Sequence, residues 1–223
     1  MSLLGSVTGS FLVALPALFS IVNPLGGALI YHQVTSERGT SERTALAWRV
    51  ASYSAIVMLV SLWIGASLMN FFGVSIEALR IAGGLVVSAS AWEMLSNSSQ
   101  TETRKQEQAA SAAGAADVAF FPLTMPFTTG PGTISVAIAL SASRPSTGVE
   151  LVPFFAGLSM AAVAVALSVG ICYASADRVV TLLGPERARV LNRLSAFLLL
   201  CIGVQILLIG VQGVLSGAMA AGR

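Results

Sequence analysis

The sequence FSIVNPLGG, at residues 19–27, places an Asn-Pro pair and two glycines inside a long hydrophobic run. The sequence FTTGPGTIS, at residues 127–135, interrupts a later hydrophobic run with Gly-Pro-Gly. Proline removes a backbone donor and glycine leaves neighbouring amides and carbonyls open, so each interruption frees polar backbone at membrane depth. Interrupted segments at corresponding places in two halves of a chain are the best sequence indicator of a secondary transporter's binding site.

The composition is that of an integral membrane protein. Hydrophobic residues make up 55% of the 223, charged residues only 10%, and the mean hydropathy is +0.83. A helix needs roughly 20 apolar residues to cross about 30 Å of hydrocarbon. Six stretches meet this need: 11–34, 50–71, 78–95, 118–141, 151–176 and 194–216. We therefore expect a single all-α membrane domain over residues 1–223, with six transmembrane helices, of which helices 1 and 4 are broken.

The loop charges predict the orientation of these spans. Residues 96–116 are polar and alanine-rich, which favours a flexible cytoplasmic linker. The connectors after spans one, three and five hold Arg38, Arg43, Arg49, Arg104, Lys105, Arg178, Arg187, Arg189 and Arg193, and the opposite side holds Arg80, Arg144 and Arg223. The count of basic residues on the two sides is thus nine to three. It is eight to two without Arg80 and Arg193, which lie close to spans. The positive-inside rule then predicts that both termini face outward, to the periplasm.

The two halves of the chain show a weak internal similarity when residues 11–95 are laid over residues 118–216. Three landmarks keep their order in the two copies: Pro24 with Pro131, Gly73 with Gly184, and Arg80 with Arg193. A repeat of three spans must insert its second copy upside down, as the loop charges independently require, which predicts two inverted three-helix repeats. The alternative is chance similarity between apolar helices.

Several motifs together resemble a known family. They are Asn23-Pro24-Leu25-Gly26 in span one, Arg80-Ile81-Ala82-Gly83-Gly84 opening span three, Phe121-Pro122-Leu123 running to Gly130-Pro131-Gly132-Thr133-Ile134-Ser135 in span four, and Gln205 in span six. In this order they resemble the MarC family of bacterial inner-membrane proteins, also called the neutral amino acid transporter family. The resemblance implies a six-helix inner-membrane protein, and some members of the family move small neutral amino acids such as glycine and alanine. Thr128-Thr129 departs from the small apolar residues that are commoner in the family, which could change pocket polarity.

The two breaks predict how an amino acid zwitterion could be bound without ionised side chains. A half-helix that begins after a break presents amides to a carboxylate, and one that ends before it presents carbonyls to an ammonium. In span four the expected site residues are Thr129, Gly130, Pro131, Gly132, Thr133, Ile134 and Ser135, with amides from 132–134. In span one they are Asn23, Pro24, Leu25, Gly26 and Gly27, with amides from 25–27. The alternative is that both prolines merely kink packed helices.

A few polar residues near or inside the spans are candidates for further roles. Arg80 and Arg193 either snorkel to the interfaces or act as symmetry-related gates, with Glu77 and Glu186 as possible partners. Glu93 and Asp117 either bind a coupling proton or lie at headgroup level, where Asp117 would also cap a helix. Gln205 lies in the middle of span six and has either a cavity role or a packing role. His32 is expected at the interface rather than as a pH switch.

These features favour a secondary transporter that moves small neutral amino acids by alternating access, with proton coupling as a possibility. An exporter of another small polar metabolite and a non-transporting membrane scaffold or regulator remain alternatives. We expect no enzymatic activity, cofactor, metal or nucleic-acid partner, because no P-loop, metal-ligand pair or nucleophile elbow is present in the sequence. Cys172 and Cys201 are expected to pack as small hydrophobes in the bilayer. Small residues such as Gly213 and Gly217 leave a homo-oligomer open.

Overall fold

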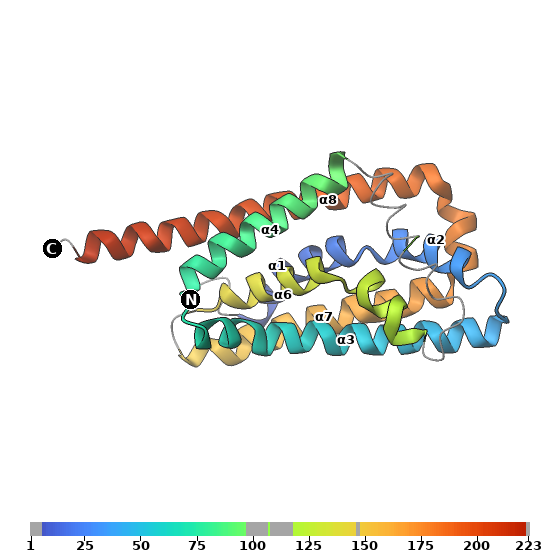
Figure 1. Cartoon of the computed structure of the whole chain (residues 1–223), viewed down its shortest axis with the longest axis horizontal. Helices are drawn as coiled ribbons and strands as arrows, with labels where there is room; N and C mark the ends of the chain where they lie inside the picture. Colours follow the sequence, from blue (N-terminus) through green and yellow to red (C-terminus); the bar gives the residue numbers. More distant parts are fainter. Residues whose placement is uncertain (1–5, 97–106, 108–117, 146–147, 222–223) are drawn as a thin grey trace.

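The fold is a bundle of long helices that run along one common axis (Figure 1). The computed structural model describes residues 6–96, 107, 118–145 and 148–221, and this part of the chain contains helices but no strand. Its elements are α1 Val7–Val22, α2 Pro24–Val34, α3 Thr40–Phe71, α4 Ile76–Ser96, the π-helical η2 Ala119–Thr128, α6 Pro131–Ala142, the short 3-10 helix η3 Gly148–Glu150, α7 Leu151–Ala174 and α8 Ala176–Ala221. The expectation of an all-α membrane protein is confirmed.

Five segments are long and apolar enough to cross a membrane. They are Val7–Val34, Thr40–Phe71, Ile76–Ser96, Gly148–Ala174 and Arg189–Gly217. The sixth predicted span, at residues 118–141, is divided between η2 with 10 residues and α6 with 12. Each piece is too short to cross about 30 Å of hydrocarbon alone, because this takes about 20 helical residues. The described chain is therefore a multi-pass membrane protein with five long spans and one divided segment.

Two helices extend well beyond the predicted hydrophobic spans. Helix α3 begins at Thr40, ten residues before residue 50, and an ion pair between Arg38 and Glu42 lies at its start. Helix α8 includes all of the predicted connector at residues 177–193 and changes direction at Gly184, whose φ is +61° and whose ψ is 169°. Hydropathy marks only the part of a helix that lies in hydrocarbon, whereas a polar helix can continue into the interface.

The helices pack mainly on partners from the other half of the sequence. Helix α1 lies along α7, α3 along α6, and α4 along α8 (Figure 1). Glycines allow these close approaches, which is typical of membrane helices. A Cβ at Gly84 would lie 2.6 Å from the Leu207 backbone nitrogen, and one at Gly203 would lie 2.8 Å from the Ser88 backbone nitrogen. Large apolar side chains such as Leu12 and Ile56 are exposed around the bundle, where lipid would cover them.

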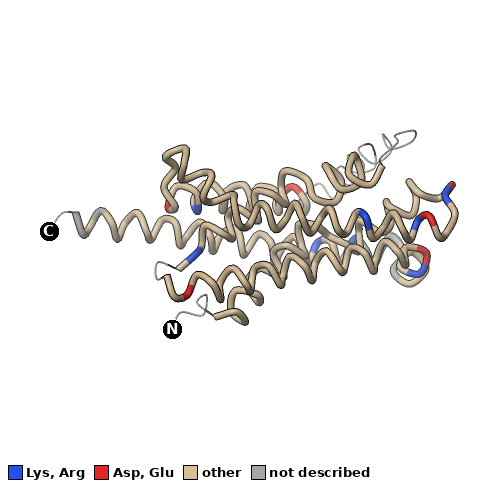
Figure 2. Tube along the Cα trace, turned by 90° about the horizontal axis from the view of Figure 1, so that it is seen from below, with Lys and Arg blue, Asp and Glu red and all other residues tan. Residues whose placement is uncertain are grey.

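The charged residues are unevenly distributed along the bundle. Figure 2 shows one group of Lys, Arg, Asp and Glu at the end near the termini and others spread from the opposite end to about the middle, with a stretch of tan chain between the two sets. This is the distribution expected when the intervening stretch lies in hydrocarbon, where an ionised group is costly.

Candidate functional site

The first break is closed by the side chain and backbone of Asn23. This residue has a left-handed φ of +51°, a conformation that Asn adopts more readily than most residues. Its N–H donates to the Phe19 carbonyl at 2.8 Å, which ends α1. Its Oδ1 accepts from the Gly26 N–H at 3.1 Å, and its carbonyl accepts from the Gly27 N–H at 2.9 Å. Two of the three amides predicted to face a ligand are therefore bonded to Asn23.

Protein side chains also occupy the space beside the first break. The Asn23 amide nitrogen donates to Oδ1 of Asn192 on α8 at 2.9 Å. A Cβ at Gly26 would lie 2.5 Å from this nitrogen and 3.0 Å from the Asn192 oxygen, and a Cβ at Gly27 would overlap the Tyr173 hydroxyl. The two glycines thus admit neighbouring side chains of the protein, and the break is filled.

At the second break, fewer of the polar groups are engaged in local hydrogen bonds. The carbonyl of Gly130 accepts from the N–H groups of Thr133 at 3.0 Å and Ile134 at 3.2 Å, so these two predicted donors are engaged. The Thr129 hydroxyl donates to the Thr124 carbonyl at 3.1 Å. Within the described chain, the N–H of Gly132 donates no hydrogen bond. One backbone donor therefore remains at the N-terminus of α6.

A cavity of about 140 Å³ lies directly at this second break. The cavity is bounded by the end of α1, the last turns of α4, the end of η2 and the start of α6, through Ile21, Ser90, Glu93, Met94, Pro126, Phe127, Thr128, Gly130, Gly132 and Thr133. A Cβ at Gly132 would lie 3.4 Å from Ile21 Cδ1 and 3.9 Å from Ser90 Oγ, which are ordinary contact distances. Gly132 therefore faces space that is not filled by protein.

The cavity combines a small volume with a few polar groups of different kinds. Hydroxyl groups come from Ser90 and Thr133, and a carboxylate comes from the exposed Glu93. Ile21, Met94 and Phe127 supply apolar surface. An engineered protein cavity of about 150 Å³ admits benzene, so this volume suits a solute of about six heavy atoms. Sites for drug-sized ligands usually measure about 300 Å³ or more.

The structure brings together some of the residues predicted for the site and separates others. Gly130, Gly132, Thr133 and Glu93 line the cavity. The residues outside its lining are Asn23, Pro24, Leu25, Gly26, Gly27, Thr129, Pro131, Ile134, Ser135 and Gln205. The Ser135 hydroxyl donates to the Pro131 carbonyl at 2.9 Å. Gln205 is exposed on α8. Asp117 lies outside the described residues.

The two predicted gating arginines have unequal environments. Arg80 donates through Nε to the Ala142 carbonyl at 2.8 Å and through Nη2 to the Arg144 carbonyl at 3.2 Å. These contacts cap the C-terminus of α6, where a positive charge is favourable. No ion pair between Arg80 and Glu77 is present among the described residues. Arg193 is exposed on α8, and the side chain of Glu186 lies outside the described part.

Sequence reasoning missed most of the cavity wall. Ser90 precedes Glu93 by three residues, a spacing that places both on one face of α4. Pro126 follows Pro122 by four residues, and non-helical backbone occurs at Phe121 and Met125. The proline pair could have indicated that the irregular region begins well before Gly130.

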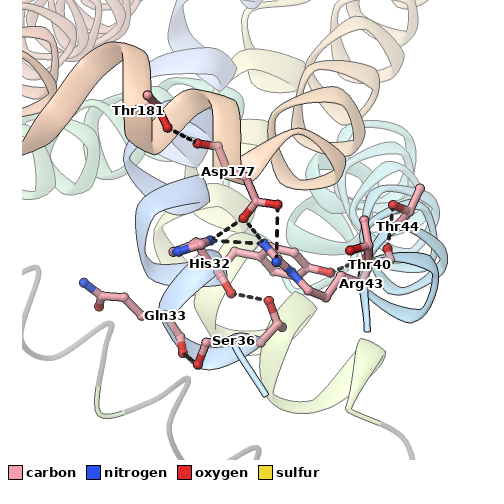
Figure 3. Close-up of polar contacts among 10 residues, drawn as sticks. His32, Gln33, Ser36, Thr40, Arg43, Thr44, Asp177 and Thr181 are labelled. Carbon is pink, nitrogen blue, oxygen red and sulfur yellow. Dashed lines mark hydrogen bonds and ion pairs between the residues drawn. The ribbon is translucent and has the colours of Figure 1, made fainter. Parts of the chain in front are cut away.

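A polar cluster connects α2, α3 and the start of α8 at one end of the bundle (Figure 3). Oδ1 of Asp177 lies 2.8 Å from Nδ1 of His32 and 2.9 Å from Nη2 of Arg43. The hydrogen bond from Arg43 lowers the pKa of the Asp177 carboxyl, and the charge of Arg43 and the contact with His32 act in the same direction. His32, expected only as an interfacial residue, thus contacts a carboxylate from the other half of the chain.

Buried tyrosines lie between this polar cluster and the cavity. The rings of Tyr31 and Tyr173 stack with centroids 4.6 Å apart, and both side chains are buried. The Tyr31 hydroxyl donates to the Arg43 carbonyl at 2.6 Å. The Tyr173 hydroxyl and the Thr128 hydroxyl, which belongs to a cavity-lining residue, lie 3.1 Å apart. The cavity is therefore separated from the polar cluster by a packed layer.

Comparison with known proteins agrees with this architecture. A family model described as MarC family integral membrane protein matches residues 8–215. The UPF0056 membrane protein of Buchnera aphidicola is 32% identical over 209 residues, which cover 91% of this chain and 92% of the relative. The UPF0056 inner membrane protein MarC of Salmonella typhimurium is 32% identical over 206 residues, and that of Citrobacter koseri is 31% identical over 205; each alignment covers 89% of this chain and 92% of the relative. No solved structure matches the chain.

These relatives and the apolar helices identify a multi-pass protein of the inner membrane. The match extends over nearly all of the described helices, including both breaks and the cavity at the second one. The chain belongs to the MarC family of integral membrane proteins.

Proposed function

We propose that the protein is a secondary transporter of small neutral amino acids, of the size of glycine or alanine, across the bacterial inner membrane. The observation that carries this proposal is the cavity of about 140 Å³ at the Gly130-Pro131-Gly132 break. A cavity of this volume accepts a solute of a few heavy atoms. A broken helix that lines a cavity is also the usual setting of a transporter's substrate site.

The groups around the cavity suit a zwitterion. The carboxylate of Glu93, which borders the cavity, offers an ammonium group a partner of opposite charge. The N-terminus of α6, with the Gly132 amide and the Thr133 hydroxyl, is the partner for a carboxylate. Glu93 is also the group that would bind a coupling proton.

Inverted repeats would supply the movement that alternating access requires. Three observations support them. Gly73 and Gly184, matched by sequence position, both have positive φ, +79° and +61°. Pro24 and Pro131, also matched, each begin the half-helix that follows a break. The pairing of α1 with α7, α3 with α6 and α4 with α8 is what a two-fold axis between the halves would produce.

One end of the bundle contains the contacts that must open for passage. His32 and Arg43 belong to the first half and Asp177 to the second, so their ion pairs tie the halves together. The stack of Tyr31 on Tyr173 does the same. We place this end on the cytoplasmic side, with both termini periplasmic, because its connectors hold most of the basic residues.

The transport proposal has two rivals. A non-transporting scaffold would need no cavity beside its broken helices, whereas this protein has one at the second break. An exporter of another small polar metabolite fits the same cavity, and only the choice of solute distinguishes it.

The direct test is uptake and counterflow of radiolabelled glycine and alanine in proteoliposomes, with and without an imposed proton gradient. We expect saturable transport by the wild type and none by Gly132→Leu, whose side chain would fill the cavity. Gly217→Leu is the matched control, because a Cβ at Gly217 meets no atom within 4 Å. Absence of transport and exchange by folded wild-type protein would exclude these substrates and favour the rivals.

A further inference from the structure

Helix α8 presents one face to the rest of the protein. This face carries residues at alternating spacings of three and four: Ala196, Leu199, Gly203, Ile206 and Gly210. All five are buried. A Cβ at Gly203 would contact Ser88 and Val87, and one at Gly210 would contact Ile81, so the face packs on α4. Helix α4 is therefore the partner of this face, while Asn192 of α8 contacts the first break through Asn23.

A second seam runs along the opposite face of α8. It repeats the alternating spacing of three and four over almost the whole apolar part of the helix, as Leu191, Leu194, Leu198, Cys201, Gln205, Leu208, Gln212, Leu215 and Met219. The members from Leu194 to Gln212 each lie two positions from a residue of the α4-facing series, a rotation of about 200°. All nine are exposed, with apolar members ranging from 37% at Leu191 to 69% at Met219. Such a heptad pattern is typical of a helix that packs on another helix.

The polar members show that hydrocarbon alone is a poor partner for this seam. Gln205 lies sixteen residues after Arg189 and twelve before Gly217, near the middle of the membrane-spanning segment. Its side-chain amide is exposed and has no hydrogen-bond partner in the described part of the chain. An amide in lipid without a partner is costly, whereas a neighbouring helix can offer a donor and an acceptor. Gln212 places a second exposed side-chain amide on the same seam, two turns later.

We propose that this seam binds α8 of a second copy of the chain, forming a parallel two-fold dimer. All copies of a membrane protein insert in the same direction, so a two-fold axis along the membrane normal makes the two helices parallel and pairs each seam residue with its counterpart. Glutamine suits such self-pairing because its amide both donates and accepts. Gln205 of one copy bonds Gln205 of the other, and the leucines pack around this layer.

The small residue Gly213 does not form this interface. A Cβ at Gly213 would lie 3.0 Å from Cγ of Glu77, so this glycine faces α4 within one copy. The dimer seam is instead set by the larger residues Leu208 and Leu215 around the glutamines. Dimerisation through the exposed seam does not depend on transport activity.

Cys201 provides a native reporter, because it lies in the seam one turn before Gln205 and is exposed. In membranes of cells that express Cys172→Ala, where Cys201 is the only cysteine, a thiol oxidant should convert most of the protein into a disulfide-linked homodimer. Cys201→Ala, which retains Cys172 on α7, should remain monomeric. As a matched control, Val204→Cys in a Cys172→Ala, Cys201→Ala background places an exposed thiol beside the seam, and should crosslink at least tenfold more slowly.

Gln205→Leu tests the polar layer separately. We expect it to lower the rate of Cys201 crosslinking several-fold, while Gln205→Asn, which keeps an amide, retains part of it. Equal crosslinking from positions 201 and 204 would indicate random collision and overturn the proposal. It would also be overturned if Cys201 reacts with a maleimide yet forms no homodimer, or crosslinks to a different protein instead.

Discussion

The two helix breaks look alike in sequence but have different structures. At Asn23-Pro24 the asparagine side chain caps α2, bonds Asn192, and leaves no room beside Gly26. At Gly130-Pro131-Gly132 a cavity of about 140 Å³ lies beside Gly132. The difference arises from one residue type, because an amide side chain at the first break satisfies the backbone that glycine leaves open at the second. A broken helix therefore indicates free polar backbone, and its neighbours decide whether protein or solute binds it.

The largest expected effect is at the filled break. Gly27→Leu would drive a side chain into the buried Tyr173 hydroxyl and the Tyr31 stack, so we expect almost no folded protein. The yield of monodisperse protein on size-exclusion chromatography in detergent measures this. Gly132→Leu, the same change at the hollow break, should give a normal yield. Similar yields from both variants would remove the distinction between the breaks.

The hollow break should act as a size filter. Gly132→Ala places one methyl group in the cavity without a close contact, since its nearest neighbour is 3.4 Å away. One methyl group in a tight site changes discrimination by roughly tenfold or more. We expect the ratio of glycine uptake to alanine uptake, measured as kcat/KM, to rise by about tenfold. An unchanged ratio would show that Gly132 does not face the substrate.

The hydrogen bonds of Asn23 with Gly26 and Asn192 at the first break contribute moderately to the free energy of unfolding. Asn23→Ala leaves the Gly26 N–H and the Asn192 oxygen without their partner, which costs about 1–3 kcal/mol of unfolding free energy. Denaturant unfolding in detergent, with a double-mutant cycle to Asn192→Ala, measures the shared part. Ser135→Ala is the control at the other break, because its hydroxyl bonds only the carbonyl of Pro131 within α6. Equal losses of unfolding free energy from Asn23→Ala and Ser135→Ala would contradict this contribution of Asn23.

The smallest effect concerns the end of α2, where His32 and Arg43 hold Asp177. The folded-state pKa of Asp177 is lowered, so its stabilisation is present above the ordinary aspartate pKa near 3.9 and is lost as pH falls through the lower folded value. The carboxylate is largely exposed, so the effect stays below about 1 kcal/mol. The free energy of unfolding, measured from pH 7 down to pH 3, should depend less on pH in Asp177→Asn than in the wild type. Identical pH profiles for the two proteins would exclude a contribution of the Asp177 ion pairs to stability.

Local features could be predicted from the sequence and long-range packing could not. The helix break at Asn23 and the irregular backbone before Pro131 follow from proline and glycine chemistry, which acts over a few residues. The hydrophobic length of the spans likewise depends on composition alone. That Asn192 would occupy the first break, and that Ser90 would face the second, depends on how α8 and α4 pack against them.

The orientation of Gln205 shows the same limit. A polar residue in the middle of a span needs a partner, but its position in the sequence does not say on which side that partner lies. The structure places it on the face of α8 opposite α4 and away from the cavity. The charge of Arg80 was visible in the sequence, whereas its role as a cap for α6 required the position of Ala142.

The most direct test of the account is whether a solute protects the cavity at the second break. In a Cys172→Ala, Cys201→Ala background, Ser90→Cys places a thiol in the cavity wall, and Gly217→Cys places one in open space on α8. The rate of maleimide labelling in membranes is measured with and without glycine or alanine. The account predicts that these solutes slow labelling at residue 90 and leave residue 217 unaffected. Unchanged labelling at residue 90, at solute concentrations that saturate transport, would contradict it.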